Sequence, residues 1–248
     1  MIWQALMDFL ARLRGSSPYR RVIPQQPLDF TVDESAVGFV GNFPVNRIYG
    51  VYSGKSAQGS STFDLSIIVN FTGYFSGPSN PVASHLIGGL GSSAQGYGLY
   101  ATVVASGHIS GSSGPPDTRV MTFTRAEGHV FLDPRLDTNK TLPATAGSPV
   151  LLNSAGDDLG VLSATNIVPS QSQGILGTSF GGAFQIVFRD PAVAVPAGAP
   201  YWPGLPRVGL RVLIQGQIND TDLSGGTVGG SLSLAFLALP SSSDLYPG

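Results

Sequence analysis

The stretch TFDLSIIVNFT, residues 62 to 72, decides the fold class. Its apolar residues stand at every second position: Phe63, Leu65, Ile67, Val69 and Phe71. The positions between them are polar, with Ile68 as the one exception. Because successive side chains of a strand point to opposite faces of a sheet, this alternation predicts a half-buried antiparallel strand.

The same alternation recurs along the chain, in RVGLRVLIQGQI (207 to 218), AFQIVFR (183 to 189) and SLSLAFLA (231 to 238). Further short candidates, separated by Gly, Pro, Asn and Ser, cover 37 to 43, 46 to 52, 82 to 88, 97 to 109, 119 to 125, 128 to 132, 149 to 153, 158 to 164 and 174 to 180. About a dozen short strands of this kind predict an all-β, antiparallel β-sandwich or barrel. We expect a jelly-roll-like order, in a single domain over residues 29 to 248.

The composition supports strands and turns. Only 11% of the residues are charged, and the acidic residues include just two glutamates, Glu34 and Glu127. Glu and Lys favour helices, so their scarcity beside 33 glycines favours β-structure. A surface with so few charges suits a protein that packs against copies of itself or against other subunits. The absence of cysteine excludes disulfides and thiolate metal sites.

One segment, MIWQALMDFLARLRG at residues 1 to 15, predicts a short N-terminal amphipathic helix. At 100° per residue its large apolar side chains fall on one side: Ile2, Trp3, Leu6, Met7, Phe9, Leu10 and Leu13. Gly15 stands where a helix C-cap belongs. Four arginines form a basic cluster at its end and beyond it: Arg12, Arg14, Arg20 and Arg21. We therefore interpret residues 1 to 28 as an arm that contacts a neighbouring subunit or an internal membrane.

The arm does not fit a secretory signal. Its first charge is Asp8, inside the segment that should be apolar, and its basic residues follow that segment. No window reaches the roughly 18 apolar residues of a membrane-spanning helix. We expect a protein made in the cytoplasm.

A long segment rich in Pro and Ala, residues 190 to 206, interrupts the strand pattern. It carries Tyr201 and Trp202 between prolines. An aromatic pair of this kind suits an intersubunit loop. The alternative is that the pair covers one end of the barrel.

No catalytic motif is complete. TAGSPVLLNSAGDDLGVL, residues 145 to 162, resembles the region around the nucleophile of trypsin-like serine proteases, but the residue three places before Pro149 is Ala146, which cannot attack. NDTDLSGG begins like a calcium loop but has Ser231 where a bidentate glutamate is needed. No glycine motif for phosphate binding opens a helix. We expect no enzyme, no cofactor and no metal.

The remaining titratable side chains are isolated in the sequence. His85, His108 and His129 are each 20 or more residues apart, so a metal site would require three strands to converge. Alternation places His108 on the face of Thr102 and Ser106. Nothing in the spacing of the two glutamates indicates an acid and base pair.

These features together favour a structural assembly protein, a capsid or coat subunit of a virion. Its partners would be copies of itself and other structural subunits, with the arm on a membrane surface as an alternative. Nucleic-acid contact is expected to be weak, because four arginines neutralise few phosphates.

Three alternatives stay open. The first is an accessory β-rich subunit at the cytoplasmic face of a membrane complex. The second is a ligand-binding or cyclase-type β-barrel enzyme, which would show an apolar pocket in which one or two polar groups converge. The third, a membrane β-barrel, fits the alternation but not the polar outward faces.

Overall fold

The computed structural model describes residues 26–88, 95–112, 118–168, 172–176, 182–189, 193–194, 201–206, 209–218 and 226–238. In these residues the chain is all-β apart from one short 3-10 helix. The amphipathic helix and the four arginines expected before residue 22 lie outside the described residues. They stay predictions.

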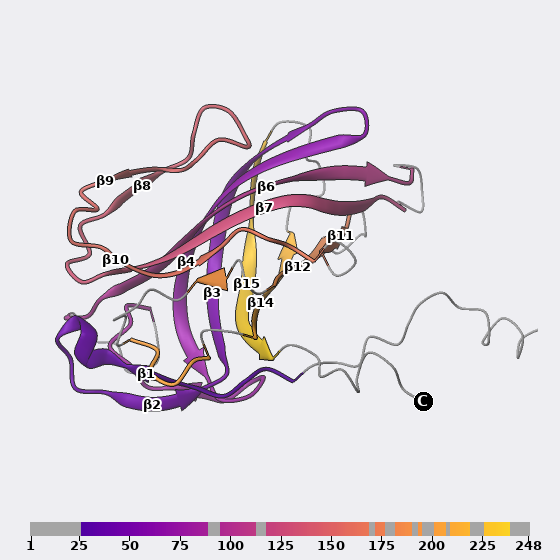
Figure 1. Cartoon of the computed structure of the whole chain (residues 1–248). Helices are drawn as coiled ribbons and strands as arrows, with labels where there is room; N and C mark the ends of the chain where they lie inside the picture. The colour runs from indigo at the N-terminus through magenta and orange to yellow at the C-terminus, as the bar shows by residue number, and fades with distance from the viewer. Residues whose placement is uncertain are drawn as a thin grey trace, which may run out of the picture.

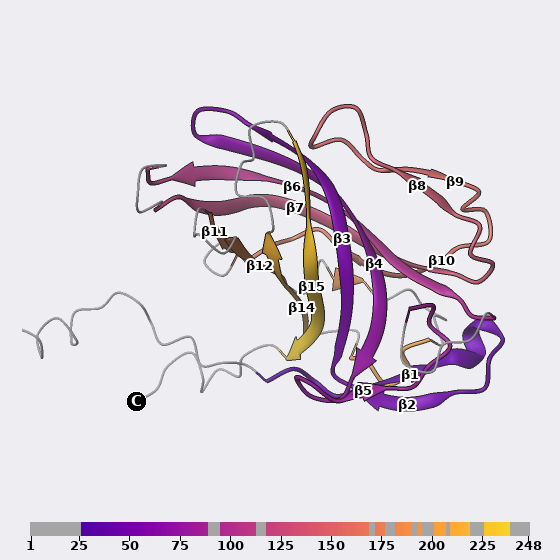
Figure 2. The same ribbon diagram turned by 180° about the vertical axis from the view of Figure 1, so that it is seen from behind.

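Eight strands form a closed antiparallel barrel (Figures 1 and 2). They are β3 (Arg47–Gln58), β4 (Thr62–Phe75), β6 (Gly98–Ser110), β7 (Val120–Asp133), β11 (Gln173–Ile175), β12 (Gly182–Phe188), β14 (Leu210–Ile218) and β15 (Thr227–Ala238). Each strand pairs with the next in this order, and β15 closes the ring by pairing with β3. All-β barrel architecture is therefore confirmed.

The expected jelly-roll order is wrong. In a jelly roll, strands distant in sequence pair through Greek-key connections, whereas here neighbours along the chain pair. Short connections favour pairing between neighbouring strands. Only three residues join β3 to β4, and a short turn is enough to join two antiparallel strands. The barrel is of the up-and-down kind.

Between β7 and β12, two short strands take the place of one long strand in the barrel wall. Along one edge of β7, β11 pairs with the first half and β10 (Leu159–Ala164) with the second half. Ile167 bridges to Phe188, and the backbone N–H of Val168 donates to the carbonyl of Val187 at 2.7 Å. The short β13 (Val193–Ala194) pairs with β10. The strands β10 and β11, with Ile167 and Val168, thus fill the gap that would otherwise leave two strand edges open.

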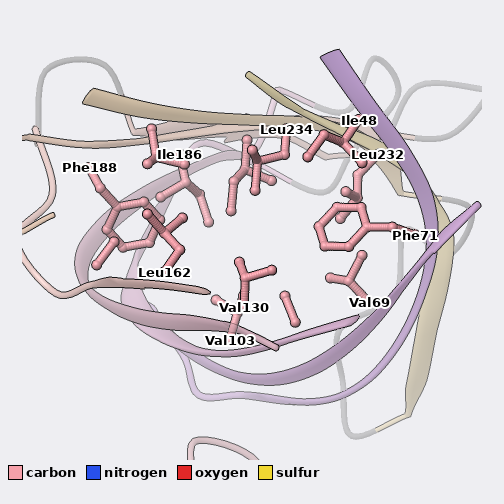
Figure 3. Close-up of a cluster of buried hydrophobic side chains, with 14 of the residues drawn as sticks. Ile48, Val69, Phe71, Val103, Val130, Leu162, Ile186, Phe188, Leu232 and Leu234 are labelled. Atoms are coloured by element: carbon pink, nitrogen blue, oxygen red, sulfur yellow. The ribbon is translucent and has the colours of Figure 1, made fainter. Parts of the chain in front are cut away.

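The barrel interior is a packed apolar core (Figure 3). The five alternating residues of the 62 to 72 stretch are all buried in it, as predicted. Side chains from the other strands meet them, and those drawn in Figure 3 include Ile48, Val103, Val130, Ile186, Phe188, Leu232 and Leu234. Each such side chain contributes about 1.5 to 3 kcal/mol by its burial.

The outer face of β4 and β6 is also covered, which explains Ile68. Ile68 is buried although it points outward from the barrel. The neighbouring outward residue Ser66 donates from Oγ to the carbonyl of Ser148 at 2.6 Å. Residues 134 to 158, with the small hairpin β8 (Asn139–Thr141) and β9 (Leu151–Asn153), therefore cover this face.

One end of the barrel is closed by a cap, which we define as residues 28–45 and 201–205. It contains β1 (Phe30–Asp33), the 3-10 helix η1 (Glu34–Val37) and β2 (Asn42–Val45), and the two strands pair with each other. Figure 2 shows these elements across the end of the barrel, beside the short β5 (Pro81–Val82). The strand expected over 37 to 43 is wrong in its first half, because Gly38 ends η1 with a φ of 85°.

Tyr201 and Trp202 belong to this cap. They are 0% and 3% exposed, so they cover an end of the barrel, as the alternative in the sequence predicted. The carbonyl of Tyr201 accepts a hydrogen bond from the backbone N–H of Asp33 at 2.9 Å. In this position the pair offers no exposed aromatic surface to a neighbouring subunit.

Candidate functional site: an apolar pocket at the hairpin end

A pocket opens inside the barrel at the end opposite the cap, where β3 turns into β4 and β6 into β7. We call this the hairpin end. The space that it encloses is small, about 20 Å³, which is enough for one water molecule. Its lining comes from the inward faces of six strands: Tyr52, Leu65, Ile67, Met121, Phe123, Phe184, Ile186, Ile218 and Val228. Eight of these nine side chains are wholly apolar or, for Met121, carry only a thioether.

Glycines face two aromatic rings of the lining. A Cβ atom on Gly216 would come within 2.6 Å of the Phe184 ring, and one on Gly230 within 3.0 Å of the Tyr52 ring. A glycine inside a strand often marks such a close approach. The rings therefore occupy the space that side chains at these two positions would fill.

Contacts between aromatic rings fix the shape of the pocket. Tyr52 and Phe184 meet edge to face, with ring centroids 5.7 Å apart and an interplanar angle of 89°. Phe123 meets Phe63 in the same way at 5.2 Å and 84°. Such pairs add about 0.5 to 1.5 kcal/mol each beyond burial, so the walls are held in place before any ligand enters.

Tyr52 supplies the one strong hydrogen-bonding side chain in this lining. Its hydroxyl donates to the backbone carbonyl of Gln217 at 2.9 Å. Burial raises the pKa of the Tyr52 phenol well above its ordinary value, so the group is neutral at physiological pH. The pocket is thus an uncharged, mostly apolar site with a single polar atom in its wall.

A second cluster of polar side chains lies under the cap, at the other end of the barrel. Glu34, in η1, is 1% exposed and accepts three hydrogen bonds. Oε1 accepts from the backbone N–H of His85 at 2.8 Å and from the hydroxyl of Tyr97 at 3.0 Å. Oε2 lies 2.7 Å from Nδ1 of His85. Full hydrogen bonding explains how a carboxyl group is tolerated in this buried position.

Three buried phenols continue this cluster. The hydroxyl of Tyr201 lies 2.7 Å from that of Tyr97 and also contacts that of Tyr74. Because Tyr97 donates to Glu34, a consistent chain runs from Tyr74 to Tyr201, then to Tyr97 and the carboxyl group. The three tyrosines are fully buried and join the cap to the barrel, whereas the side chain of His85, beside Glu34, is 38% exposed.

These phenols make stability sensitive to alkaline pH. Burial raises the pKa of Tyr74, Tyr97 and Tyr201 above the ordinary value. Above about pH 10 the unfolded chain loses these protons while the folded chain keeps them, so each tyrosine lowers the free energy of unfolding by about 1.4 kcal/mol per pH unit. In urea unfolding, we expect the contribution of these tyrosines to the free energy of unfolding to be constant below about pH 10 and to fall steeply above it.

The same titration has an internal control. In Tyr74→Phe one of the three phenols is gone, so the slope above pH 10 should be shallower than in the parent protein. The tyrosinate absorbance of Tyr74, taken as the difference between the parent protein and Tyr74→Phe, should rise together with the loss of circular dichroism. Tyr74 tyrosinate forming at the ordinary pKa while the fold persists would contradict the burial argument.

The other candidates from the sequence lie apart from both clusters. Glu127 accepts from His129 on the outer face of β7 at 3.0 Å, so the two glutamates do not meet. His108 is exposed on the outward face of β6, as alternation predicted. Within the described residues, no group of three or more His, Asp or Glu side chains is placed to hold a metal ion.

Sequence reasoning missed the Glu34 and His85 pair and the pocket. The pair joins residues 51 positions apart, through a cap whose course no local pattern reveals. The pocket had one sequence signal, the glycines at inward positions of strands.

Comparisons with known proteins identify no relative. No family model matches the chain, and neither a curated protein nor a solved structure matches it. In the part of the chain that the structure describes, no helix is long and apolar enough to cross a membrane.

Proposed function

We propose that this protein binds a small, uncharged apolar molecule inside its barrel. The observation that carries the proposal is the pocket at the hairpin end, which is lined almost entirely by apolar side chains of six strands. Ligand sites in proteins are typically concave, apolar and largely formed in advance, with few polar groups. Eight-stranded closed barrels have an interior wide enough for one small ligand.

Binding is favoured over a cyclase-type reaction. Among the described residues that line the pocket there is no acid or base, since Tyr52 is a neutral phenol whose proton is already donated. General acid–base chemistry needs a group within hydrogen-bond reach of the reacting atom. The side chains present can hold and orient an apolar molecule but not transfer a proton to it.

The enclosed space is small, so a ligand must be small or displace part of the lining. Toluene, a small uncharged apolar molecule, is a suitable first probe.

Methionine methyl groups provide the measurement. The chain has three methionines, Met1, Met7 and Met121, of which Met121 lies in the described residues and lines the pocket. In protein carrying ¹³C-labelled methionine methyl groups, toluene should shift the Met121 signal through ring-current effects. Met121→Leu assigns the signal. If no toluene concentration up to saturation shifts it, the proposal is wrong.

Two matched substitutions, one that fills the pocket and one on the outer face, test where toluene binds. Val228→Phe places a ring in the lumen and should abolish the toluene response, because the ligand and the new ring need the same space. Val51→Phe makes the same change on the outer face of β3, at a side chain 52% exposed, and should bind toluene as the parent protein does. Equal binding by both variants would place the toluene elsewhere.

The coat-subunit and accessory-subunit interpretations depend on the arm of residues 1 to 28. Its helix and arginines lie outside the described residues. Both interpretations stay predictions, and ligand binding in the barrel is compatible with either.

A further inference from the structure

At the capped end, a histidine ring that is open to solvent is held by a buried carboxyl group. The side chain of His85 is 38% exposed, whereas that of Glu34 is 1% exposed. Oε2 of Glu34 lies 2.7 Å from Nδ1 of His85, and Oε1 accepts the backbone N–H of the same residue at 2.8 Å. One carboxyl group thus fixes both the backbone and the ring of His85.

The chain around Glu34 is folded so that its carboxyl group reaches this position. The backbone N–H of Glu34 donates to the carbonyl of Gly41 at 2.9 Å. A Cβ atom at Gly41 would collide with Oε2 of Glu34, so glycine leaves the room that the carboxyl group needs. The ring of Phe39, from the same loop, stacks on the His85 ring with centroids 4.6 Å apart and an interplanar angle of 17°. The imidazole is therefore held in place before any molecule approaches it.

The carboxylate determines which ring nitrogen of His85 is free. An ionised carboxylate has only acceptor atoms, so the neutral ring carries its proton on Nδ1 and donates it to Oε2 of Glu34. Nε2 then has a lone pair, and no hydrogen bond to it is formed by the residues that the structure describes. Because Nδ1 faces Glu34 and Phe39 covers one ring face, the exposed part of the side chain includes Nε2.

A carboxylate in this position makes the imidazole more reactive. It raises the basicity of the opposite ring nitrogen, and it stabilises the positive charge that the ring acquires when that nitrogen forms a bond. The effect is stronger for a buried carboxylate, because water does not screen its charge.

A second histidine provides the internal comparison. The side chain of His129 is also 38% exposed, and its Nε2 lies 3.0 Å from Oε1 of Glu127. Glu127 is 45% exposed, so water screens this pair. The two histidines are equally accessible and differ in the burial of the carboxyl group. A difference in reactivity between them therefore measures the effect of the buried carboxylate.

The surroundings of the His85 ring favour a neutral, apolar reactant. Ile87 is exposed and lies two residues along, with the buried Leu86 between, so it points to the same side as His85. Ile87 and Phe39 offer an uncharged surface beside the ring. An anionic reactant would be repelled by the Glu34 carboxylate.

We infer that His85 is a nucleophilic histidine that hydrolyses small neutral esters with a good leaving group, and that Glu34 is its positioning residue. Nε2 attacks the carbonyl carbon and forms a C–N bond, the ester C–O bond breaks, and the alcohol leaves as its anion. Water then adds to the acyl carbon, the C–N bond breaks with its electron pair returning to Nε2, and the acid is released with one proton. That proton balances the leaving anion, so ester and water become acid and alcohol.

Hydrolysis of p-nitrophenyl acetate tests the role of His85. Release of p-nitrophenolate, followed by absorbance, is compared in the parent protein, His85→Gln and His129→Gln. The His85→Gln variant should lose most of the rate, because the attacking nitrogen is gone. The His129→Gln variant should keep the parent rate. A rate that His85→Gln leaves unchanged would overturn the inference.

Glu34→Gln tests the positioning role. Its amide nitrogen can donate to Nδ1 of His85, which moves the ring proton to Nε2 and removes the attacking lone pair. Loss of a carboxylate that orients a histidine typically costs about 10- to 100-fold in activity, and we expect a fall of this size while circular dichroism shows an intact fold. Glu127→Gln is the matched change at the exposed pair and should keep the parent rate. A parent rate in Glu34→Gln would make Glu34 a structural residue only.

A measurement on the parent protein keeps the inference testable if Glu34→Gln does not fold. Diethyl pyrocarbonate modifies neutral imidazoles, and mass spectrometry of peptides locates the modified residues. His85 should be modified before His129, although the two side chains are equally exposed. Slower or equal modification of His85 would overturn the inference. These outcomes do not depend on toluene binding, so the two sites are tested separately.

Discussion

Replacing Glu34 with alanine is expected to lower the free energy of unfolding by about 3 to 5 kcal/mol, because it removes the acceptor from a buried polar cluster. The hydroxyl of Tyr97 and the backbone N–H of His85 both donate to this carboxyl group. The Tyr97 hydroxyl finds no water to replace it, since Tyr97 is 0% exposed and Glu34 itself is 1% exposed. An unsatisfied buried donor costs about 1 to 3 kcal/mol, and the cavity left by the Glu34 side chain adds to this loss.

Glu34→Gln is the matched control. The amide oxygen still accepts from Tyr97 and from the backbone of His85, and the amide nitrogen can donate to Nδ1 of His85 once the ring proton moves to Nε2. The loss should therefore be well below that of Glu34→Ala. Urea unfolding followed by circular dichroism measures both. An alanine variant within about 1 kcal/mol of the parent protein would show that the cluster is not a main attachment of the cap.

Local alternation in the sequence was enough to predict the strands and their inward faces. Phe63 to Phe71 at alternate positions, and Leu232, Leu234 and Phe236 in β15, all point into the core as expected. Alternation reports which face of a strand is buried, and this is a property of one strand at a time. The same residues are therefore buried whichever strand lies beside it.

Strand order was not predictable in the same way. Barrels and jelly rolls both bury alternate residues, so the pattern does not distinguish pairing between neighbours from pairing across the chain. The strand boundaries were also missed here. Residues 119 to 125 and 128 to 132 were expected as two strands, but both belong to the continuous strand β7, in which Gly128 pairs with Val103.

The two ends of the barrel differ in what holds them. At the capped end, a buried carboxyl group and three phenols are fully engaged with one another, so this end contributes stability. At the hairpin end, the wall is apolar and glycines keep Tyr52 and Phe184 against it. The hairpin end carries the concave apolar lining from six strands, which is why we propose the binding function there.

Replacing Phe236 with alanine tests whether the cap and the barrel share one core. Phe236, in β15, is 0% exposed and meets Phe30 and Trp202 of the cap, with centroid distances of 4.9 Å and 5.2 Å. Truncating a buried phenylalanine removes its transfer free energy and leaves a cavity, so we expect a loss of about 3 to 5 kcal/mol. Phe236→Leu fills most of that space and should lose clearly less.

Hydrogen exchange locates the effect of this substitution. The backbone N–H of Leu28 donates to the carbonyl of Phe236 at 2.8 Å, so its exchange reports on the attachment of the cap. If cap and barrel form one cooperative core, the Leu28 amide and the amides of β4 lose protection together in Phe236→Ala, by the amount seen in urea unfolding. Loss of protection at Leu28 alone, with β4 unchanged, would instead make the cap a separate unit that opens on its own. Toluene should still shift the Met121 signal in either variant, because the described lining of the pocket comes from six barrel strands and includes no residue of the cap.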